Sequence, residues 1–295
     1  MLTILLGVLE EGLVYAIMAL GVYITYKILD FPDLSVDGTF PLGGAITAVL
    51  IVKGVHPVVT LFISFLVGAL AGLLTGIIHV KLKVRDLLSG IIMMTALYSV
   101  NLRIAGRANV AIFTRDTIFN NAFFDNAIPD AFRPYLIAAI LLVIVIIMKS
   151  LLDIYLRTKS GYLLRAVGDN DALVTSLAED KSTIKIIGLS IANAFVALAG
   201  SIYTQKSGFF EISTGTGTMV IGLASVIIGI NLMKKISFVK ATTAVVIGSV
   251  IYKLCVSVAI QLGMAASDLK MITAGLFLII LVVSNDRKRR AKANA

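Results

Sequence analysis

Two clusters of polar side chains interrupt otherwise apolar sequence, and each stands at the beginning of a short apolar run. The clusters are Asp33, Ser35 and Asp37 before residues 40–52, and Thr214, Thr216 and Thr218 at the beginning of residues 218–233. Carboxylate and hydroxyl oxygens can hydrogen-bond water or a polar solute, so we predict that both clusters line a hydrophilic pathway. The alternative is that Asp33 and Asp37 only cap the helix that follows them, as Asp and Ser prefer to do.

The sequence around these clusters has the composition of a membrane protein. Of its 295 residues, 58% are hydrophobic and only 15% are charged, against roughly 25% charged in a soluble domain. Nine apolar stretches lie near residues 3–26, 40–52, 57–80, 87–102, 134–152, 186–204, 218–233, 241–260 and 271–285. Several are shorter than the ~20 residues of a straight membrane crossing. We therefore expect one all-α transmembrane domain over residues 1–295, a polytopic helical bundle of about 8–10 segments with broken or re-entrant helices.

An internal repeat relates the two clusters. A shift of 179 residues aligns Gly21, Thr25, Gly38, Thr39, Gly43 and Ala45 with Gly200, Thr204, Gly217, Thr218, Gly222 and Ala224. The first repeat covers about residues 12–100 and the second about 190–285. If successive segments cross the membrane in alternating directions, the helix that ends near Tyr26 runs inward and its counterpart, which ends near Gln205, runs outward. The two repeats are therefore predicted to have inverted orientations. Inverted repeats with paired interrupted helices are typical of transport proteins, with the pathway between the halves.

Lys and Arg in the connections indicate the orientation in the membrane. With the C-terminus inside, 17 of them lie on the inner side and 7 on the outer side. The N-terminus and the extracytoplasmic loop 103–133 are then expected outside, and the loop 153–185 and the basic tail 286–295 in the cytoplasm. The net charge of +9 belongs to these inner segments, which favours contact with anionic lipid over nucleic acid. No cationic region precedes the first apolar run, so we expect it to stay as a helix.

Residues for catalysis, metal binding or nucleotide binding do not form a recognisable set. Cys255, His56 and His79 cannot make a disulfide framework or a metal cluster. The sequence contains no GxxxxGK[ST], HExxH or GxSxG pattern, and its Gly-rich STGTGTM lacks the Lys that would hold a nucleotide. We therefore expect this chain to bind no cofactor or metal and to hydrolyse no ATP. Glu10 and Glu11, in an apolar helix, either act in transport or only snorkel to its outer end.

The cytoplasmic loop 153–185 is too short to fold alone and too charged to enter hydrocarbon. We predict a short helix over about residues 168–178, presented to a partner. Gly168 is expected to break the preceding segment, Asp169 and Asn170 to cap the helix start, and an apolar stripe to lie in a groove of the partner. The stripe consists of Leu173, Val174 and Leu177. The alternative is a solvated helix that lies on the membrane.

Three of these segments carry a resemblance to a known family. DLSV at residues 33–36, followed by Gly38, resembles the DLSVGS signature of ribose-type ABC transporter permeases, and ASVIIG at 224–229 resembles their AAVVIGG run. GYLLRAVGDN at 161–170 is similar to the GxxLRAxGxNPxA stretch that ribose and branched-chain amino acid permeases share. The sequence departs from that stretch at Asp171, where Pro is usual, and at 178–180, which leaves the end of the docking helix open.

The resemblance implies a permease subunit of an ABC importer in the bacterial inner membrane. Its expected partners are a second permease copy in a homodimer, ATP-binding subunits that hold ATP and Mg, and an extracytoplasmic solute-binding protein. The coupling helix would fall on about residues 168–178, with Gly168, Asp169, Asn170, Leu173, Val174 and Leu177 at the contact. FPDLSVDG resembles permeases for hydrophobic or aromatic amino acids, which favours an amino acid as substrate. A sugar or a nucleoside, and an ion-coupled secondary transporter, remain the alternatives.

Overall fold

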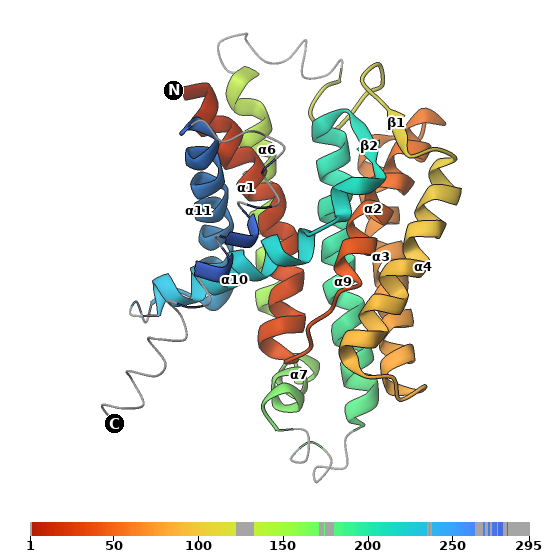
Figure 1. Cartoon of the computed structure of the whole chain (residues 1–295), viewed down its shortest axis with the longest axis vertical. Helices are drawn as coiled ribbons and strands as arrows, with labels where there is room; N and C mark the ends of the chain where they lie inside the picture. Colours follow the sequence, from red (N-terminus) through yellow and green to blue (C-terminus); the bar gives the residue numbers. More distant parts are fainter. Residues whose placement is uncertain are drawn as a thin grey trace.

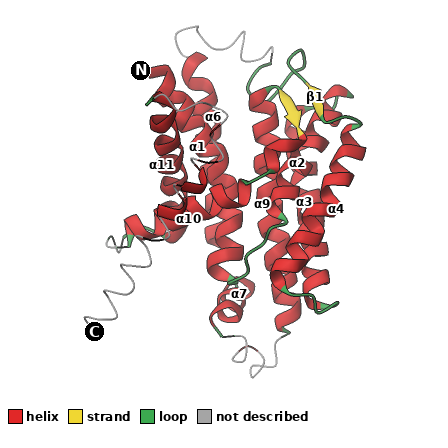
Figure 2. Cartoon of the chain, in the orientation of Figure 1, coloured by secondary structure: helices red, strands yellow, loops and turns green. Residues whose placement is uncertain are grey.

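The structure of the chain, a computed structural model, describes residues 2–121, 133–170, 174, 180–234, 236, 238–262, 268, 271, 273–275, 277–279 and 282. In this part of the chain, seven helices are long and apolar enough to cross a membrane, and an eighth apolar helix, Val36–Val52, is shorter. Helices dominate, beside two short strands (Figure 2). The prediction of an all-α polytopic membrane protein is therefore confirmed.

The elements follow the predicted apolar stretches closely. They are α1 (Leu2–Val22), the π-helical η1 (Tyr23–Ile28), α2 (Val36–Val52), α3 (Pro57–Val80), α4 (Asp86–Ala105), β1 (Asn109–Ala111), α6 (Arg133–Tyr155), α7 (Lys159–Asp169), α9 (Lys181–Ser207), β2 (Phe209–Glu211), the 3₁₀ turn η3 (Ile212–Gly215), α10 (Thr218–Met233) and α11 (Ala241–Gln261). The predicted stretch 271–285 is described only in part, at residues 271, 273–275, 277–279 and 282.

Most long helices run along the long axis of the molecule, whereas α10 lies across it (Figure 1). The N-terminus and the antiparallel β1–β2 pair lie at one end, and α7 lies at the other (Figure 1). The helices α1 and α9 form the centre, since 56% and 72% of their apolar windows are buried. Both short apolar helices, α2 and α10, pack against this central pair. The two interrupted segments therefore meet in the interior and not at the lipid surface.

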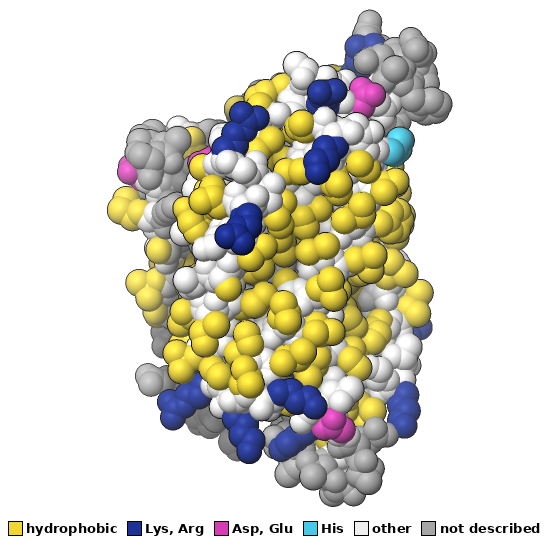
Figure 3. All heavy atoms as spheres, turned by 90° about the vertical axis from the view of Figure 1, so that its right-hand side faces the viewer, with side chains coloured by type: hydrophobic (Ala, Val, Ile, Leu, Met, Phe, Trp, Pro, Cys, Tyr) yellow, Lys and Arg dark blue, Asp and Glu magenta, His cyan; other side chains and the backbone are white. Residues whose placement is uncertain are grey.

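The outer helices carry the apolar surface that a bilayer requires. Leu66 and Leu70 on α3 and Ile146 on α6 are all more than half exposed. On the face shown in Figure 3, hydrophobic side chains cover the middle, while Lys and Arg gather toward the two ends. An exposed apolar band between charged ends is the surface expected of a protein surrounded by lipid.

Local signals place the helix ends. Pro57 occupies the first turn of α3, and the His56 ring accepts a hydrogen bond from the Val58 N–H. Asp180 caps α9 by accepting from the N–H groups of Ser182 and Thr183. Hydrogen bonds to the Asp180 carboxylate lower its pKa, and the one from the Thr183 hydroxyl has the largest effect, ahead of those from the N–H groups. The beginning of α9 is therefore fixed by the last residues of the loop 153–185.

One pair of glycines that the 179-residue shift aligns, Gly43 and Gly222, stands at close helix contacts. A Cβ atom on Gly43 of α2 would collide with the backbone of Ala197 on α9. A Cβ atom on Gly222 of α10 would meet Val22 on α1, with the methyl group of Met18 3.4 Å away. Met18 is the position that the shift aligns with Ala197. The packing of α2 on α9 and of α10 on α1 thus each involve one of the two aligned glycines, and the repeat itself stays a prediction.

Candidate functional site

Asp37 joins the two interrupted segments. Its carboxylate accepts hydrogen bonds from the backbone N–H of Gly217 at 2.9 Å and of Met219 at 2.7 Å, and from the Thr218 hydroxyl at 3.0 Å. Gly217 is the N-cap of α10 and has a φ of +86°, a conformation that glycine adopts without strain. A carboxylate at this position satisfies free N–H groups and faces the positive end of the helix dipole.

Asp37 is therefore a helix cap, as the alternative interpretation proposed, but it does not cap the helix that the sequence suggested. Asp37 lies in the first turn of α2, yet it caps α10, a helix about 180 residues away in the sequence. A sequence pattern can suggest a cap for the next helix only, because the partner of a long-range contact depends on the fold. The carboxylate thereby fastens α2 of the first half to α10 of the second half.

Asp33 and Ser35 form a different, fully enclosed network. Both side chains and that of Asn193 on α9 have no exposed surface. Asp33 accepts from the Ser35 N–H at 2.9 Å and from the Asn193 amide at 2.8 Å, and the Ser35 hydroxyl donates to the Asn193 amide oxygen at 3.2 Å. These bonds fix the connection between η1 and α2 to the central helix α9. Neither Asp33 nor Ser35 lines a cavity described here.

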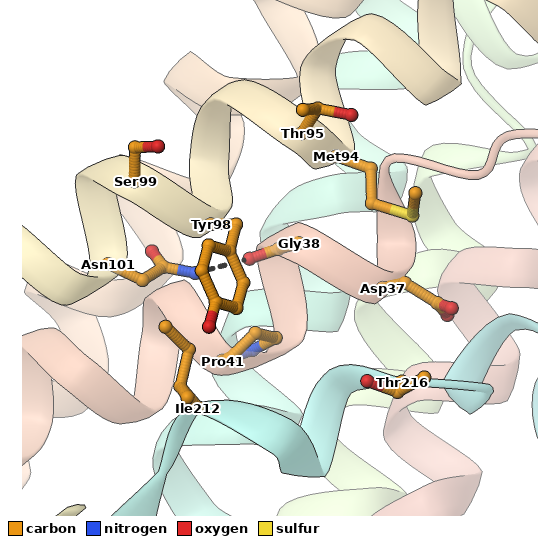
Figure 4. A pocket seen from close by; sticks show the side chains of 10 residues that line it. All are labelled: Asp37, Gly38, Pro41, Met94, Thr95, Tyr98, Ser99, Asn101, Ile212 and Thr216. Atoms are coloured by element: carbon orange, nitrogen blue, oxygen red, sulfur yellow. Dashed lines mark hydrogen bonds between the residues drawn. The ribbon is translucent and has the colours of Figure 1, made fainter. Parts of the chain in front are cut away.

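A first cavity of about 340 Å³ lies beside Asp37 (Figure 4). Its wall includes Asp37 of α2, Thr216 from the connection before α10, and Tyr98 and Asn101 of α4. The Asn101 amide donates to the Gly38 carbonyl at 2.9 Å, and its own buried oxygen has no hydrogen-bond partner among the described residues. The sequence analysis missed both α4 residues, although Asn101 is a polar residue in an apolar helix and so carried a signal.

A second cavity, of about 420 Å³, lies on the other side of the same connection. Thr214 and Thr216 line it, together with residues of α1, α9, α10 and α11. Thr216 thus belongs to the walls of both cavities. Of the six predicted pathway residues, the structure brings Asp37, Thr216 and Thr218 together, and it separates them from the Asp33 network.

Glu10 and Glu11 are paired, so neither only snorkels. Glu10 contacts the Lys206 ammonium of α9 at 3.2 Å, and Glu11 contacts the Lys253 ammonium of α11 at 3.0 Å. Lys253 sits in the middle of α11, where an unpaired charge would be costly. The two ion pairs hold α1 to its neighbours on both sides.

The predicted docking segment is only partly described. The helix α7 includes Gly168 and ends one residue later, at Asp169, with Asn170 as its C-cap. A Cβ atom on Gly168 would collide with the Ile28 carbonyl, so this glycine allows α7 to pack closely on the end of η1. The helix predicted over about residues 168–178 lies largely outside the described residues, so the capping of its start by Asp169 and Asn170 stays a prediction.

Val174 does not point toward a partner in this structure. Its side chain has no exposed surface and belongs to the main hydrophobic core of the chain. This burial differs from the prediction that Val174 contacts a partner, because spacing alone does not tell which side of an apolar stripe faces its own protein. Leu173 and Leu177, the other two residues of the stripe, lie outside the described residues.

Comparison with known proteins agrees with this architecture. Residues 4–282 match the family model described as branched-chain amino acid transport system / permease component. The chain is 45% identical over 291 residues to the tyrosine transport system permease protein of Clostridioides difficile (strain R20291), which covers 99% of this chain and 95% of that one.

The more distant relatives include permeases named for ribose and permeases named for branched-chain amino acids. The ribose import permease protein RbsC of Escherichia coli (strain K12) is 26% identical, with 76% of this chain and 68% of the relative covered. The probable branched-chain amino acid transport permease protein LivH of Methanocaldococcus jannaschii is also 26% identical, with 72% and 70% covered. No solved structure shows a significant match. A family match over nearly the whole length, on a polytopic bundle with two interrupted helices, places the chain in the family of branched-chain amino acid transport system permease components.

Proposed function

We propose that this chain is the membrane permease subunit of an ATP-driven importer for an amino acid, and that the amino acid is aromatic. The observation that carries the proposal is the 45% identity, over 99% of this chain, to a protein named as a tyrosine transport permease. Similarity of that extent supports a shared substrate class, whereas the ribose permeases, at 26% identity, are more remote.

The proposed complex contains two copies of this chain, ATP-binding subunits that hold ATP and Mg, and an extracytoplasmic solute-binding protein. The sequence has no nucleotide-binding motif, so ATP hydrolysis belongs to a separate subunit. The helix α7 lies at one end of the molecule and offers a surface for that subunit (Figure 1).

In this proposal the end that carries α7 faces the cytoplasm of a bacterium, and the N-terminus lies outside. Lys81 and Lys83 lie in the connection from α3 to α4, and Lys240 contacts Asp153 near the end of α6, so we assign these cations to the inner side, as the positive-inside rule requires. Cysteines at Ser182 and at Asn121, in a Cys255→Ser background, should be labelled from the cytoplasm and from outside, respectively. The reverse labelling would invert the orientation and separate α7 from any ATPase.

The solute is proposed to pass between the two halves, at the connection before α10. Asp37 fixes the beginning of α10, while Thr216 lines both cavities and Thr214 lines the second. Backbone that interrupts a helix at membrane depth is tolerated where it is buried in protein or lines a wet cavity. The connection before α2 is buried in protein, and the connection before α10 lines the two cavities.

The function is tested by reconstituting the permease with its ATP-binding subunit and binding protein in proteoliposomes. We expect uptake of L-tyrosine that requires ATP hydrolysis, with no comparable uptake of ribose. The permease purified alone should hydrolyse no ATP. Uptake of ribose in place of tyrosine would overturn the substrate class. Uptake driven by an ion gradient without the ATPase would identify a secondary transporter.

Coupling through the loop is tested with Leu177→Asp. If Leu177 lies at the contact, a buried unpaired charge should uncouple ATP hydrolysis from uptake or dissociate the ATPase, while the permease still inserts in the membrane. Leu82→Asp is the matched control, since Leu82 is 66% exposed in the connection between α3 and α4. Normal uptake by an intact Leu177→Asp complex would show that this segment does not couple the two subunits.

A further inference from the structure

Two opposite charges stand side by side on the wall of the second cavity, the one of about 420 Å³. The Lys253 ammonium of α11 lies 3.0 Å from the Glu11 carboxylate of α1. The side chain of Lys253 is 13% exposed, whereas that of Glu11 is 48% exposed. The side chain of Lys253 is therefore mostly buried, whereas that of Glu11 is accessible to an incoming group.

Aromatic rings surround the buried member. The Lys253 ammonium lies 4.1 Å from the centroid of the Tyr15 ring, within the range of a cation–π contact. Tyr15 stacks on Phe40 with the ring centroids 5.9 Å apart, and Tyr203 packs against it at 6.0 Å. Tyr15, Tyr203 and Tyr252 all line the cavity, and Tyr203 is the most exposed of the three, so its ring offers surface to a ligand.

Polar groups on the opposite wall come from the interrupted segment. Ser213, Thr214 and Thr216 of η3 and the connection to α10 line the same cavity. Its volume falls within the roughly 300–1,000 Å³ of small-molecule sites, which are mostly apolar with a few placed polar groups. One cation, one anion, aromatic rings and hydroxyls are the groups that the zwitterion and the ring of an aromatic amino acid can bind.

We propose that this cavity is a binding site for an aromatic amino acid within the permease, which rests on the proposed function for its substrate class. Lys253 binds the α-carboxylate, Glu11 binds the α-ammonium, and the tyrosine rings contact the side chain. The two charges of the ligand replace the contact between Lys253 and Glu11, so each protein charge keeps a partner of opposite sign. A sugar, an amine or a carboxylic acid would leave at least one charge unpaired, and the site therefore selects zwitterions.

The neighbouring ion pair supplies a matched control. Glu10 and Lys206 also join α1 to an adjacent helix, at 3.2 Å, and their side chains are 12% and 16% exposed. Neither residue belongs to the wall of the cavity. Loss of this pair removes a similar contact from the fold without removing a proposed ligand group.

The test measures binding of radiolabelled L-tyrosine to the permease–ATPase complex in lipid nanodiscs, without the binding protein. Lys253→Met and Glu11→Gln should each weaken binding at least about tenfold, the loss expected for one charge-assisted hydrogen bond. Lys206→Met and Glu10→Gln should bind like the wild type. The double variant with Glu11→Lys and Lys253→Glu restores an ion pair but exchanges the ends of the site, so it should not recover binding.

Competitors identify the ligand chemistry. Tyramine, which lacks the carboxylate, and N-acetyltyrosine, which lacks the ammonium, should compete at least about tenfold more weakly than L-tyrosine. Phosphoethanolamine carries the charges of a zwitterionic lipid headgroup without an aromatic ring, and it should not compete. Displacement of tyrosine by phosphoethanolamine would assign the cavity to lipid and overturn the proposal.

Two results separate this proposal from the proposed function. If proteoliposomes import tyrosine but the nanodisc complex binds none, or the Lys253 and Glu11 variants bind normally, the site is wrong and the function stands. Recovery of binding by the charge-exchanged double variant would likewise show that the pair is only structural. If the complex imports ribose and not tyrosine, the proposed function is wrong, whatever the binding measurements show.

Discussion

The two junctions that interrupt the helices differ in how their polar groups are satisfied. In the first junction, between η1 and α2, Asp33 and Ser35 are completely buried and bound to Asn193. In the second junction, before α10, Ser213 and Thr216 are exposed and line cavities. The two segments occupy corresponding places in the predicted repeat. The polar groups of the first junction are buried, so we call it the sealed junction, whereas those of the second, the open junction, are exposed to cavities.

The chemistry of their side chains accounts for the difference. A carboxylate in the interior requires donors around it, and the first junction supplies them from its own backbone and from α9. In the second junction, Ser213 donates to the Glu211 carboxylate and Thr214 to the Glu211 carbonyl, so the local turn is satisfied by short-range bonds. The hydroxyl of Thr216, which lines both cavities, stays available to a solute, so we expect that only one junction needs to be open for a pathway between the halves.

The largest contrast should come from the matched glycines that support the junctions. Gly43→Ala places a methyl group against the Ala197 backbone and should destabilise the protein by about 3 kcal/mol, because backbone cannot move aside easily. Gly222→Ala meets only the Val22 and Met18 side chains and should cost about 1 kcal/mol. Detergent-induced unfolding of the two variants measures the difference. Equal costs would mean that both halves are packed with the same tightness.

The sealed junction is broken directly by Asp33→Ala. The Asn193 amide and the Ser35 N–H lose their acceptor in the interior, so we expect a loss of stability of about 2 kcal/mol. The double variant with Asn193→Ala should be less destabilised than the sum of the single variants, since the two residues share one network. Additive losses in this cycle would contradict the assignment of Asp33 as a structural lock.

The link between the junctions is weakened by Asp37→Ala. The beginning of α10 then loses its cap, which should cost about 1.5 kcal/mol. Asp37→Asn retains an oxygen acceptor and should cost less. Both variants should also slow uptake in proteoliposomes, because α10 is no longer held at the edge of the two cavities. A fully stable and active Asp37→Ala protein would show that the halves are joined elsewhere.

The open junction should respond least in stability. Thr216→Val keeps the shape of the side chain but removes a hydroxyl that lines both cavities, so unfolding should change by less than about 0.5 kcal/mol. Uptake of the solute should nevertheless change in rate or in apparent affinity. If Thr216→Val altered stability and left uptake at the wild-type rate, the second junction would be structural as well.

The sequence alone determined the architecture of the membrane domain. The apolar stretches, the two short helices and the repeated glycines could all be predicted, because the length of a hydrophobic run and the position of a polar interruption are local properties. Asp37, Thr216 and Thr218 were also found in this way, as polar residues at helix interruptions. The charges in the connections predicted an orientation by an equally local rule.

Only the tertiary structure decided which polar group meets which. Asp37 caps α10, Asp33 binds Asn193, Glu11 pairs with Lys253, and Val174 packs inward. The first three contacts join residues more than 150 positions apart, and many partners of the same chemical type could have satisfied each group in the sequence. The choice among them follows from how the central helices α1 and α9 place their neighbours, because a hydrogen bond or an ion pair forms only where packing brings donor and acceptor within about 3 Å.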